Sequence, residues 1–99
     1  MIALPLTDET AGLARRLIWF EEPDQALADS IRFIAYAFER ATHQDMQVLR
    51  RYVDDSDLVR ALDAAPPGII GPRSWSYWNA RFGRSPAPPM PVRRFGRSE

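Results

Sequence analysis

Apolar residues along this chain recur at intervals of three and four positions, and no stretch alternates cleanly between apolar and polar residues for long. Such a period is typical of helices that turn one side toward a core, whereas half-buried strands require a period of two. The sequence therefore predicts an all-α protein, a compact bundle of about five short helices.

The first two predicted helices are separated by an acidic, proline-containing break at Glu21-Glu22-Pro23, which ends the first of them. The first helix covers residues 8–20, and the second covers residues 31–41 after a short turn. The inward residues of the first helix are Leu13, Leu17 and Phe20. The second has a wide apolar arc, which indicates the central helix of the bundle. Its members are Ile31, Ile34, Ala35, Ala37, Phe38 and Ala41.

Three further helices are predicted from their start and stop signals. Thr42-His43-Gln44-Asp45 resembles a capping box and opens the third helix. Asp54-Asp55-Ser56 ends that helix and caps a fourth over residues 57–65, which stops at the following Pro-Pro-Gly. The last helix covers residues 72–82, with Pro72 in its first turn and Gly83 as the left-handed residue that closes it.

Composition changes sharply after this last helix. Residues 86–91 contain four prolines, and Val92-Arg93-Arg94-Phe95 follows. Proline cannot continue a helix, so a polyproline II or disordered conformation is expected, as a spacer or as a strap along the chain's own surface. We therefore divide the chain into a single helical domain, residues 1–83, and a proline- and arginine-rich extended tail, residues 84–99.

The amino-acid content excludes several classes of protein. Hydrophobic residues at 45% and aromatic residues at 11% are enough to build a core. The absence of cysteine excludes disulfides, thiolate metal sites and thiol nucleophiles. The amino terminus lacks the basic residues of a secretory signal, and no apolar run reaches the roughly 18 residues of a membrane span. These features predict a cytoplasmic protein that does not contact a membrane.

Charge is balanced over the whole chain but unevenly placed along it. All 13 basic residues are arginine. Residues 1–72 contain seven arginines against 12 acidic residues, whereas residues 73–99 contain six arginines against Glu99 alone. The carboxyl-terminal quarter is therefore basic, and arginine favours bidentate binding of carboxylate or phosphate.

No catalytic or metal-binding pattern is present in the sequence. The only histidine, His43, lies in the first turn of a predicted helix without an evident serine or thiol partner. The acidic run Asp54-Asp55-Ser56-Asp57 lacks the glycine turn and the downstream glutamate of a calcium loop. We therefore expect no enzymatic activity, no bound metal and no cofactor.

Two arginine–tyrosine rows have the same four-residue spacing on predicted helices. One is Arg73, Tyr77 and Arg81 on the last helix, opposite Trp75 and Trp78, which are expected to pack inward. The other, on the second predicted helix, consists of Arg32, Tyr36 and Arg40. Either row is explained by guanidinium groups that stack on tyrosine rings at a solvated surface, or by a surface that binds phosphate or an acidic protein.

Aromatic and helical motifs recur in a fixed order along the chain. They are Leu17-Ile18-Trp19-Phe20, Phe33-Ile34, Phe38-Glu39-Arg40, Asp45 with Leu49 and Tyr52, Leu58 and Leu62, Pro72-Arg73-Ser74-Trp75, Trp78 and Phe82-Gly83. This order resembles that of a group of short bacterial proteins often encoded beside abortive-infection-type nucleotidyltransferase toxins. The resemblance covers roughly residues 13–83, and this sequence departs from the pattern at Ala41 and Thr42, where a glycine is usual. It implies a regulatory or neutralising partner protein, and it transfers no catalytic residue.

Two functions follow as hypotheses from these observations. In the first, the chain is a non-enzymatic, antitoxin-like accessory that binds a protein partner, such as a nucleotidyltransferase, through basic side chains. In the second, it is a small DNA-binding regulator that uses the last helix between Arg73 and Arg81. A homodimer that buries the tryptophan-rich last helix is a further possibility. The expected binding residues are Arg73, Tyr77, Arg81, Arg93 and Arg94.

Overall fold

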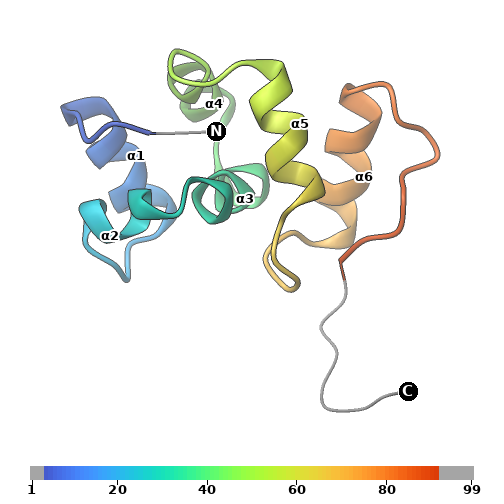
Figure 1. Ribbon diagram of the computed structural model, residues 1–99, viewed down its shortest axis with the longest axis horizontal. Helices are drawn as coiled ribbons and strands as arrows, with labels where there is room; N and C mark the ends of the chain where they lie inside the picture. Colours follow the sequence, from blue (N-terminus) through green and yellow to red (C-terminus); the bar gives the residue numbers. More distant parts are fainter. Residues whose placement is uncertain (1–3, 92–99) are drawn as a thin grey trace, which may run out of the picture.

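Six α-helices make up the part of the chain that the computed structural model describes, residues 4–91. In chain order they are α1 Asp8–Leu17, α2 Pro23–Ala28, α3 Ser30–Arg40, α4 His43–Leu49, α5 Asp55–Asp63 and α6 Pro72–Arg81 (Figure 1). Residues 4–91 contain no strand, so the predicted all-α class is confirmed, with one helix more than the pattern indicated. None of these helices has the length and hydrophobicity needed to cross a bilayer.

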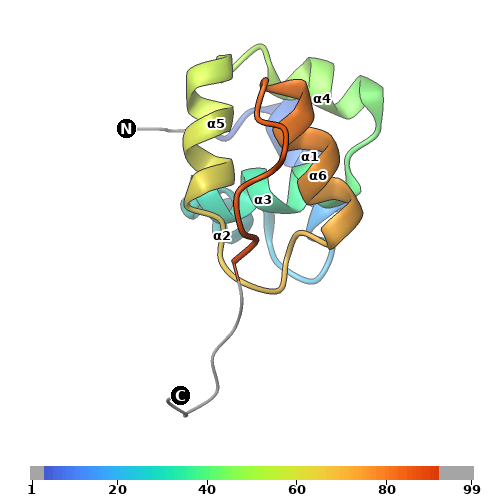
Figure 2. The ribbon, with the colours of Figure 1, turned by 90° about the vertical axis from the view of Figure 1, so that its right-hand side faces the viewer.

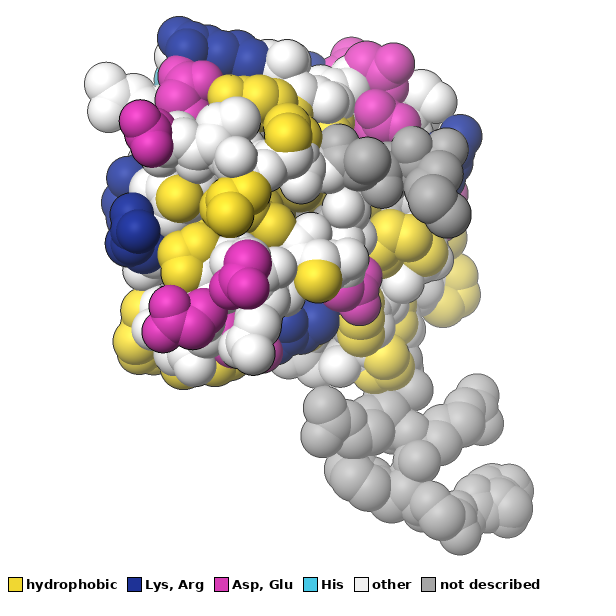
Figure 3. Space-filling model, turned by 60° about the vertical axis from the view of Figure 1, so that its left-hand side comes forward, with side chains coloured by type: hydrophobic (Ala, Val, Ile, Leu, Met, Phe, Trp, Pro, Cys, Tyr) yellow, Lys and Arg dark blue, Asp and Glu magenta, His cyan; other side chains and the backbone are white. Residues whose placement is uncertain are grey.

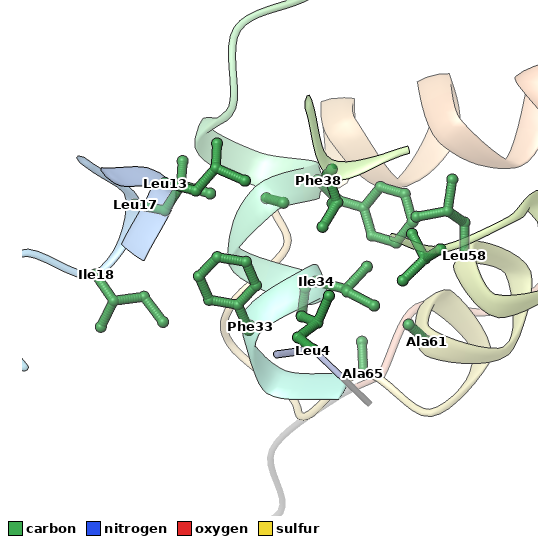
Figure 4. Close-up of a cluster of buried hydrophobic side chains, with 14 of the residues drawn as sticks. Leu4, Leu13, Leu17, Ile18, Phe33, Ile34, Phe38, Leu58, Ala61 and Ala65 are labelled. Carbon is green, nitrogen blue, oxygen red and sulfur yellow. The ribbon is translucent and has the colours of Figure 1, made fainter. Parts of the chain in front are cut away.

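The core is built around α3, which packs against α1, α2, α5 and α6. Its buried side chains lie between those of α1 on one side and those of α5 on the other (Figure 4). The prediction that this helix is central to the bundle is therefore confirmed. Ile34, Ala35, Ala37 and Phe38 of the predicted arc are buried, as are Leu13 and Leu17 of α1.

Phe33 is also fully buried, although it lies outside the apolar arc predicted for this helix. Its ring points toward α1 and Ile18, while Ile34 points toward α5 (Figure 4). A single-sided arc was the wrong model for α3 because the helix has neighbours on more than one side. Burial on two sides widens the apolar part of the helix beyond a single arc.

The connection from α1 to α2 differs from the prediction. α1 ends at Leu17 instead of continuing to residue 20, and Pro23 begins a helix instead of only ending one. Proline fits the first helical turn because its missing N–H would have no partner there. Ile18 is fully buried in the connection, and the next two aromatic residues are thereby turned out to the surface. Phe20 is consequently 52% exposed, so its predicted inward position is wrong.

Local capping explains the boundaries of α4 and α5. Thr42 accepts from the main-chain N–H of Asp45, whose carboxylate accepts in turn from the N–H of Thr42, so the predicted capping box is confirmed. Asp54 and Asp57 form the same reciprocal pair at the start of α5. Gly83 adopts a φ of 80° after α6, a left-handed conformation that favours glycine.

Residues 84–91 follow α6 and lie along it (Figure 2). The indole Nε1–H of Trp75 donates to the carbonyl oxygen of Pro88 at 2.7 Å. Arg84 pairs with Asp63 of α5 at 2.7 Å, and Ala87 and Met90 pack against the core. This part of the predicted tail therefore contacts the helical domain, whereas residues 92–99 lie outside the described part of the chain.

Candidate functional site

Arg73, Tyr77 and Arg81, named here the α6 row, lie on the outward side of α6. All three are exposed, and Tyr77 keeps 53% of its surface. The opposite side of the helix is held inside the protein, where Trp75 is 5% exposed and Asn79 is fully buried. The prediction that one side of this helix packs while the other faces out is therefore confirmed.

The α6 row borders a surface hollow of about 540 Å³, named here the groove. The groove lies between α6, the carboxyl-terminal end of α3 and α4. Its size falls within the range of pockets that bind small ligands or a few side chains. Its lining residues are Phe38, Glu39, Ala41, Thr42, His43, Met46, Gln47, Arg50, Arg73, Ser74, Tyr77, Trp78 and Arg81.

Packed apolar side chains form one wall of the groove. The rings of Phe38 and Trp78 lie 5.0 Å apart, and Met46 is almost completely buried beside the groove. The indole Nε1–H of Trp78 donates to the main-chain oxygen of Phe38 at 2.9 Å, which ties α6 to the end of α3. Tyr77 meets Trp78 edge to face at 5.1 Å. An apolar side chain from a ligand would find contacts here without a rearrangement of the core.

Two of the three arginines that line the groove form no ion pair within the described residues, although Glu39 lines the same groove. Arg73 and Arg81 form no ion pair with any residue between 4 and 91. Arg50, in contrast, pairs with Asp55. The carboxylate of Glu39 accepts from the main-chain N–H of Gly71 at 2.8 Å and so caps the start of α6. The outer wall of the groove is therefore positively charged, and its guanidinium donors face solvent.

Arg32, Tyr36 and Arg40, named here the α3 row, have the same spacing but a different environment. Arg32 donates two parallel hydrogen bonds to the carboxylate of Glu21, each 2.9 Å long. These bonds are the main cause that raises the pKa of Arg32. The guanidinium also lies over the ring of Tyr36, 5.3 Å from its centroid. The stacking on tyrosine predicted for this row is therefore observed.

Arg40 completes an aromatic cluster at the connection between α1 and α2. Its guanidinium lies 4.8 Å from the ring centroid of Trp19 and 4.7 Å from that of Tyr36. It also donates to the main-chain oxygen of Leu17 at 2.8 Å. Trp19 and Phe20 pack edge to face at 5.3 Å and are 67% and 52% exposed.

The exposed aromatic pair Trp19 and Phe20, named here the aromatic turn, was absent from the predicted binding residues. The face of the molecule that carries α1 and α2 shows several patches of hydrophobic side chains with acidic and basic side chains between them (Figure 3). Two adjacent aromatic residues directly before an acidic, proline-containing break were the available signal. The predicted helix over residues 8–20 includes both of them and therefore does not indicate their exposure.

Asp45 forms an ion pair with Arg16 that links two helices of the fold. It accepts from Arg16 Nη2 at 2.7 Å and from Arg16 Nε at 3.1 Å. Burial alone would raise the pKa of Asp45, but the hydrogen bonds from Arg16 and Thr42, with the positive charge of Arg16, outweigh it and lower that pKa. The carboxylate therefore joins α1 to the first turn of α4.

The remaining predicted residues add no further site. His43 is exposed, and its ring is within hydrogen-bond distance of Gln47 at 3.3 Å. Residues 4–91 contain no group of three or more histidine, cysteine or acidic residues that would hold a metal ion. Arg93 and Arg94 lie outside the described residues, so their binding role stays a prediction.

Comparison with known proteins adds no relative. No family model matches the chain, and no curated protein or solved structure matches it either. The relationship with toxin-associated helical proteins stays a prediction.

Proposed function

We propose that this chain is a non-enzymatic accessory protein that binds an acidic segment of a partner protein in the groove. The observation that carries this proposal is the combination of an apolar wall with two arginines that lack an acidic partner among residues 4–91. Guanidinium groups bind carboxylates with two parallel hydrogen bonds, and aromatic residues with arginine are enriched at the centres of protein interfaces.

The partner that the resemblance implies is a nucleotidyltransferase, which the chain would bind as an antitoxin-like subunit. A ligand segment that suits the groove carries a large apolar side chain with two carboxylates close to it. The apolar side chain would contact Phe38 and Trp78, and the carboxylates would bind Arg73 and Arg81. Tyr77 supplies a further rigid contact surface between the two arginines.

The shape of the site favours a protein ligand over duplex DNA. A recognition helix projects into a major groove about 12 Å wide. The outward side of α6 instead forms one wall of a hollow whose other wall is α4.

The test is to purify the tagged chain from its native host and to quantify a co-purifying nucleotidyltransferase by mass spectrometry. Wild type is expected to retain the partner in stoichiometric amount, and R73E/R81E is expected to lose at least about 90% of it. R15E/R60E is the matched control, because Arg15 and Arg60 are exposed, lie outside the groove and make no ion pair within residues 4–91. This control changes the net charge by the same amount.

Three outcomes would contradict the proposal. Equal loss of the partner in both variants would mean that net charge, and not the groove, determines binding. Retention by R73E/R81E would place the partner elsewhere on the chain. Recovery of nucleic acid alone, removed by nuclease or by raised salt, would favour the DNA-binding regulator instead.

A further inference from the structure

The groove and the aromatic turn have complementary chemistry. The groove presents an apolar wall and two arginines, Arg73 and Arg81, without acidic partners among residues 4–91. The aromatic turn presents two rings that are more than half exposed. Glu22 and Asp24 follow it directly, and both are exposed and free of ion pairs within the described chain. The exposed rings and carboxylates near the aromatic turn therefore match the apolar wall and the arginines of the groove.

The two surfaces cannot meet within one molecule. α1 and α2 lie at one end of the long axis, and α6 lies at the other (Figure 1). α3 lies between them. Trp19 of the aromatic turn contacts Arg40 of this helix, and Trp78 of the groove contacts Phe38 of the same helix. A contact between the aromatic turn and the groove therefore requires a second copy of the chain.

We infer that the groove of one copy binds the aromatic turn of a second copy, with Glu22 and Asp24 paired to Arg73 and Arg81. The inference rests on the proposed function, because it assigns an occupant of the same groove. A partner protein and a second copy then compete for one site. Free chains associate with each other as their concentration rises, and partner binding competes with that association.

The aromatic turn is prepared for binding by its contacts within the fold. Arg40 lies against the rings of Trp19 and Tyr36 and donates to the main-chain oxygen of Leu17. Tyr36 in turn meets Phe20 at 6.0 Å. Rings held in place lose little conformational freedom when they are buried by a ligand, which lowers the cost of association.

The contact is small, so the association is weak. Two aromatic side chains provide roughly 150–250 Å² each, which places the interface at the small end of specific protein contacts. If each of two copies binds the aromatic turn of the other in its groove, a closed dimer results. If each copy binds a different neighbour, an open linear assembly results. Either assembly has the same pair of surfaces at each contact.

The experiment is sedimentation equilibrium of the full chain from about 10 µM to about 1 mM, the range in which contacts of this size form. Wild type is expected to associate with rising concentration. W19A/F20A, which lacks the turn, and R73E/R81E, which lacks the groove cations, are each expected to associate at least about tenfold more weakly. Circular dichroism and thermal unfolding verify that both variants remain folded. A wild type that stays monomeric at about 1 mM overturns the inference.

An equimolar mixture of the two variants gives the sharpest test. It contains one intact turn and one intact groove, so a one-to-one complex is expected although each variant alone is monomeric. A mixture that stays monomeric overturns the inference. A charge-reversal rescue supports it: E22R/D24R should weaken association, and E22R/D24R/R73E/R81E should restore it to within about threefold of wild type.

Partner binding distinguishes failure of this inference from failure of the proposed function. W19A/F20A keeps the groove, so it should still retain the partner protein and should do so at lower partner concentration than wild type. A monomeric wild type that loses the partner in R73E/R81E would refute self-association and leave the function standing. R73E/R81E that keeps both the partner and self-association would refute both.

Discussion

The α3 row and the α6 row have the same residue types at the same spacing, yet they serve different purposes in the structure. In the α3 row, Arg32 is paired with Glu21, and Arg40 lies between the rings of Trp19 and Tyr36. In the α6 row, neither arginine has an acidic partner within residues 4–91. The difference lies outside both helices, in the connection between α1 and α2 that reaches over α3.

Spacing along a helix identifies which side chains share a face, but it does not identify the residues that contact that face. Glu21 is 11 positions from Arg32, and the oxygen of Leu17 is 23 positions from Arg40. A row whose partners come from elsewhere in the fold stabilises the fold. A row that finds none keeps its donors available to a ligand.

The largest effect is expected on the inner side of α6. Trp78→Ala should lower the free energy of unfolding by about 3 kcal/mol, because it removes the ring packed on Phe38 and the hydrogen bond to the Phe38 oxygen. Tyr77→Ala, one residue away and exposed, should change it by no more than about 0.5 kcal/mol. Urea unfolding of both variants measures the contrast. Equal losses would mean that α6 has no inner and outer side.

An intermediate loss of stability, which depends on pH, is expected when Asp45, the partner of Arg16, is replaced. Asp45→Ala should cost about 1.5 kcal/mol near neutral pH, since it removes the hydrogen bond that the carboxylate accepts from the N–H of Thr42 and the contact with Arg16. The folded-state pKa of Asp45 lies below its unfolded value, so its ionised form stabilises the fold above about pH 4. That stabilisation is lost as pH falls through the folded-state pKa.

The difference between Asp45→Ala and wild type should therefore shrink in acid. Urea unfolding at several pH values below neutral measures it. Arg73→Ala serves as the control, because Arg73 forms no ion pair within residues 4–91 and its effect should stay constant. A difference that grows toward low pH would contradict the direction of the pKa shift.

The smallest change in stability is expected when one arginine of each row is replaced, and it compares the two rows directly. Arg40→Met should destabilise the fold by about 1 kcal/mol, because stacking on two rings and the hydrogen bond to Leu17 are lost. Arg73→Met should change stability by less than about 0.5 kcal/mol. Thermal unfolding of the two variants in the same buffer measures the difference in stability. A larger loss for Arg73→Met would reverse the assignment of the rows.

Local signals in the sequence predicted much of the fold. The capping box of Thr42 and Asp45, the start of α6 at Pro72 and the left-handed Gly83 each depend on neighbouring residues only. The position of the α6 row could be predicted for the same reason, since Trp75 and Tyr77 point to different sides of one helix.

Features that depend on distant contacts could not be predicted. The exposure of Trp19 and Phe20 follows from the burial of Ile18, which ends α1 early. The groove exists because α4 comes to lie beside α6, an arrangement that no local pattern encodes. Phe33 is buried because α3 has neighbours on several sides.

The hydrogen bond from Trp78 to the oxygen of Phe38 joins a side chain to a main-chain atom. Every amino acid carries that oxygen, so replacement of Phe38 leaves the acceptor that holds α6 in place. Arg73, Tyr77 and Arg81 take no part in this bond, so they can change without removing it. An engineer could vary residues 73, 77 and 81 in a library and select new specificities on a scaffold whose helix positions stay constant.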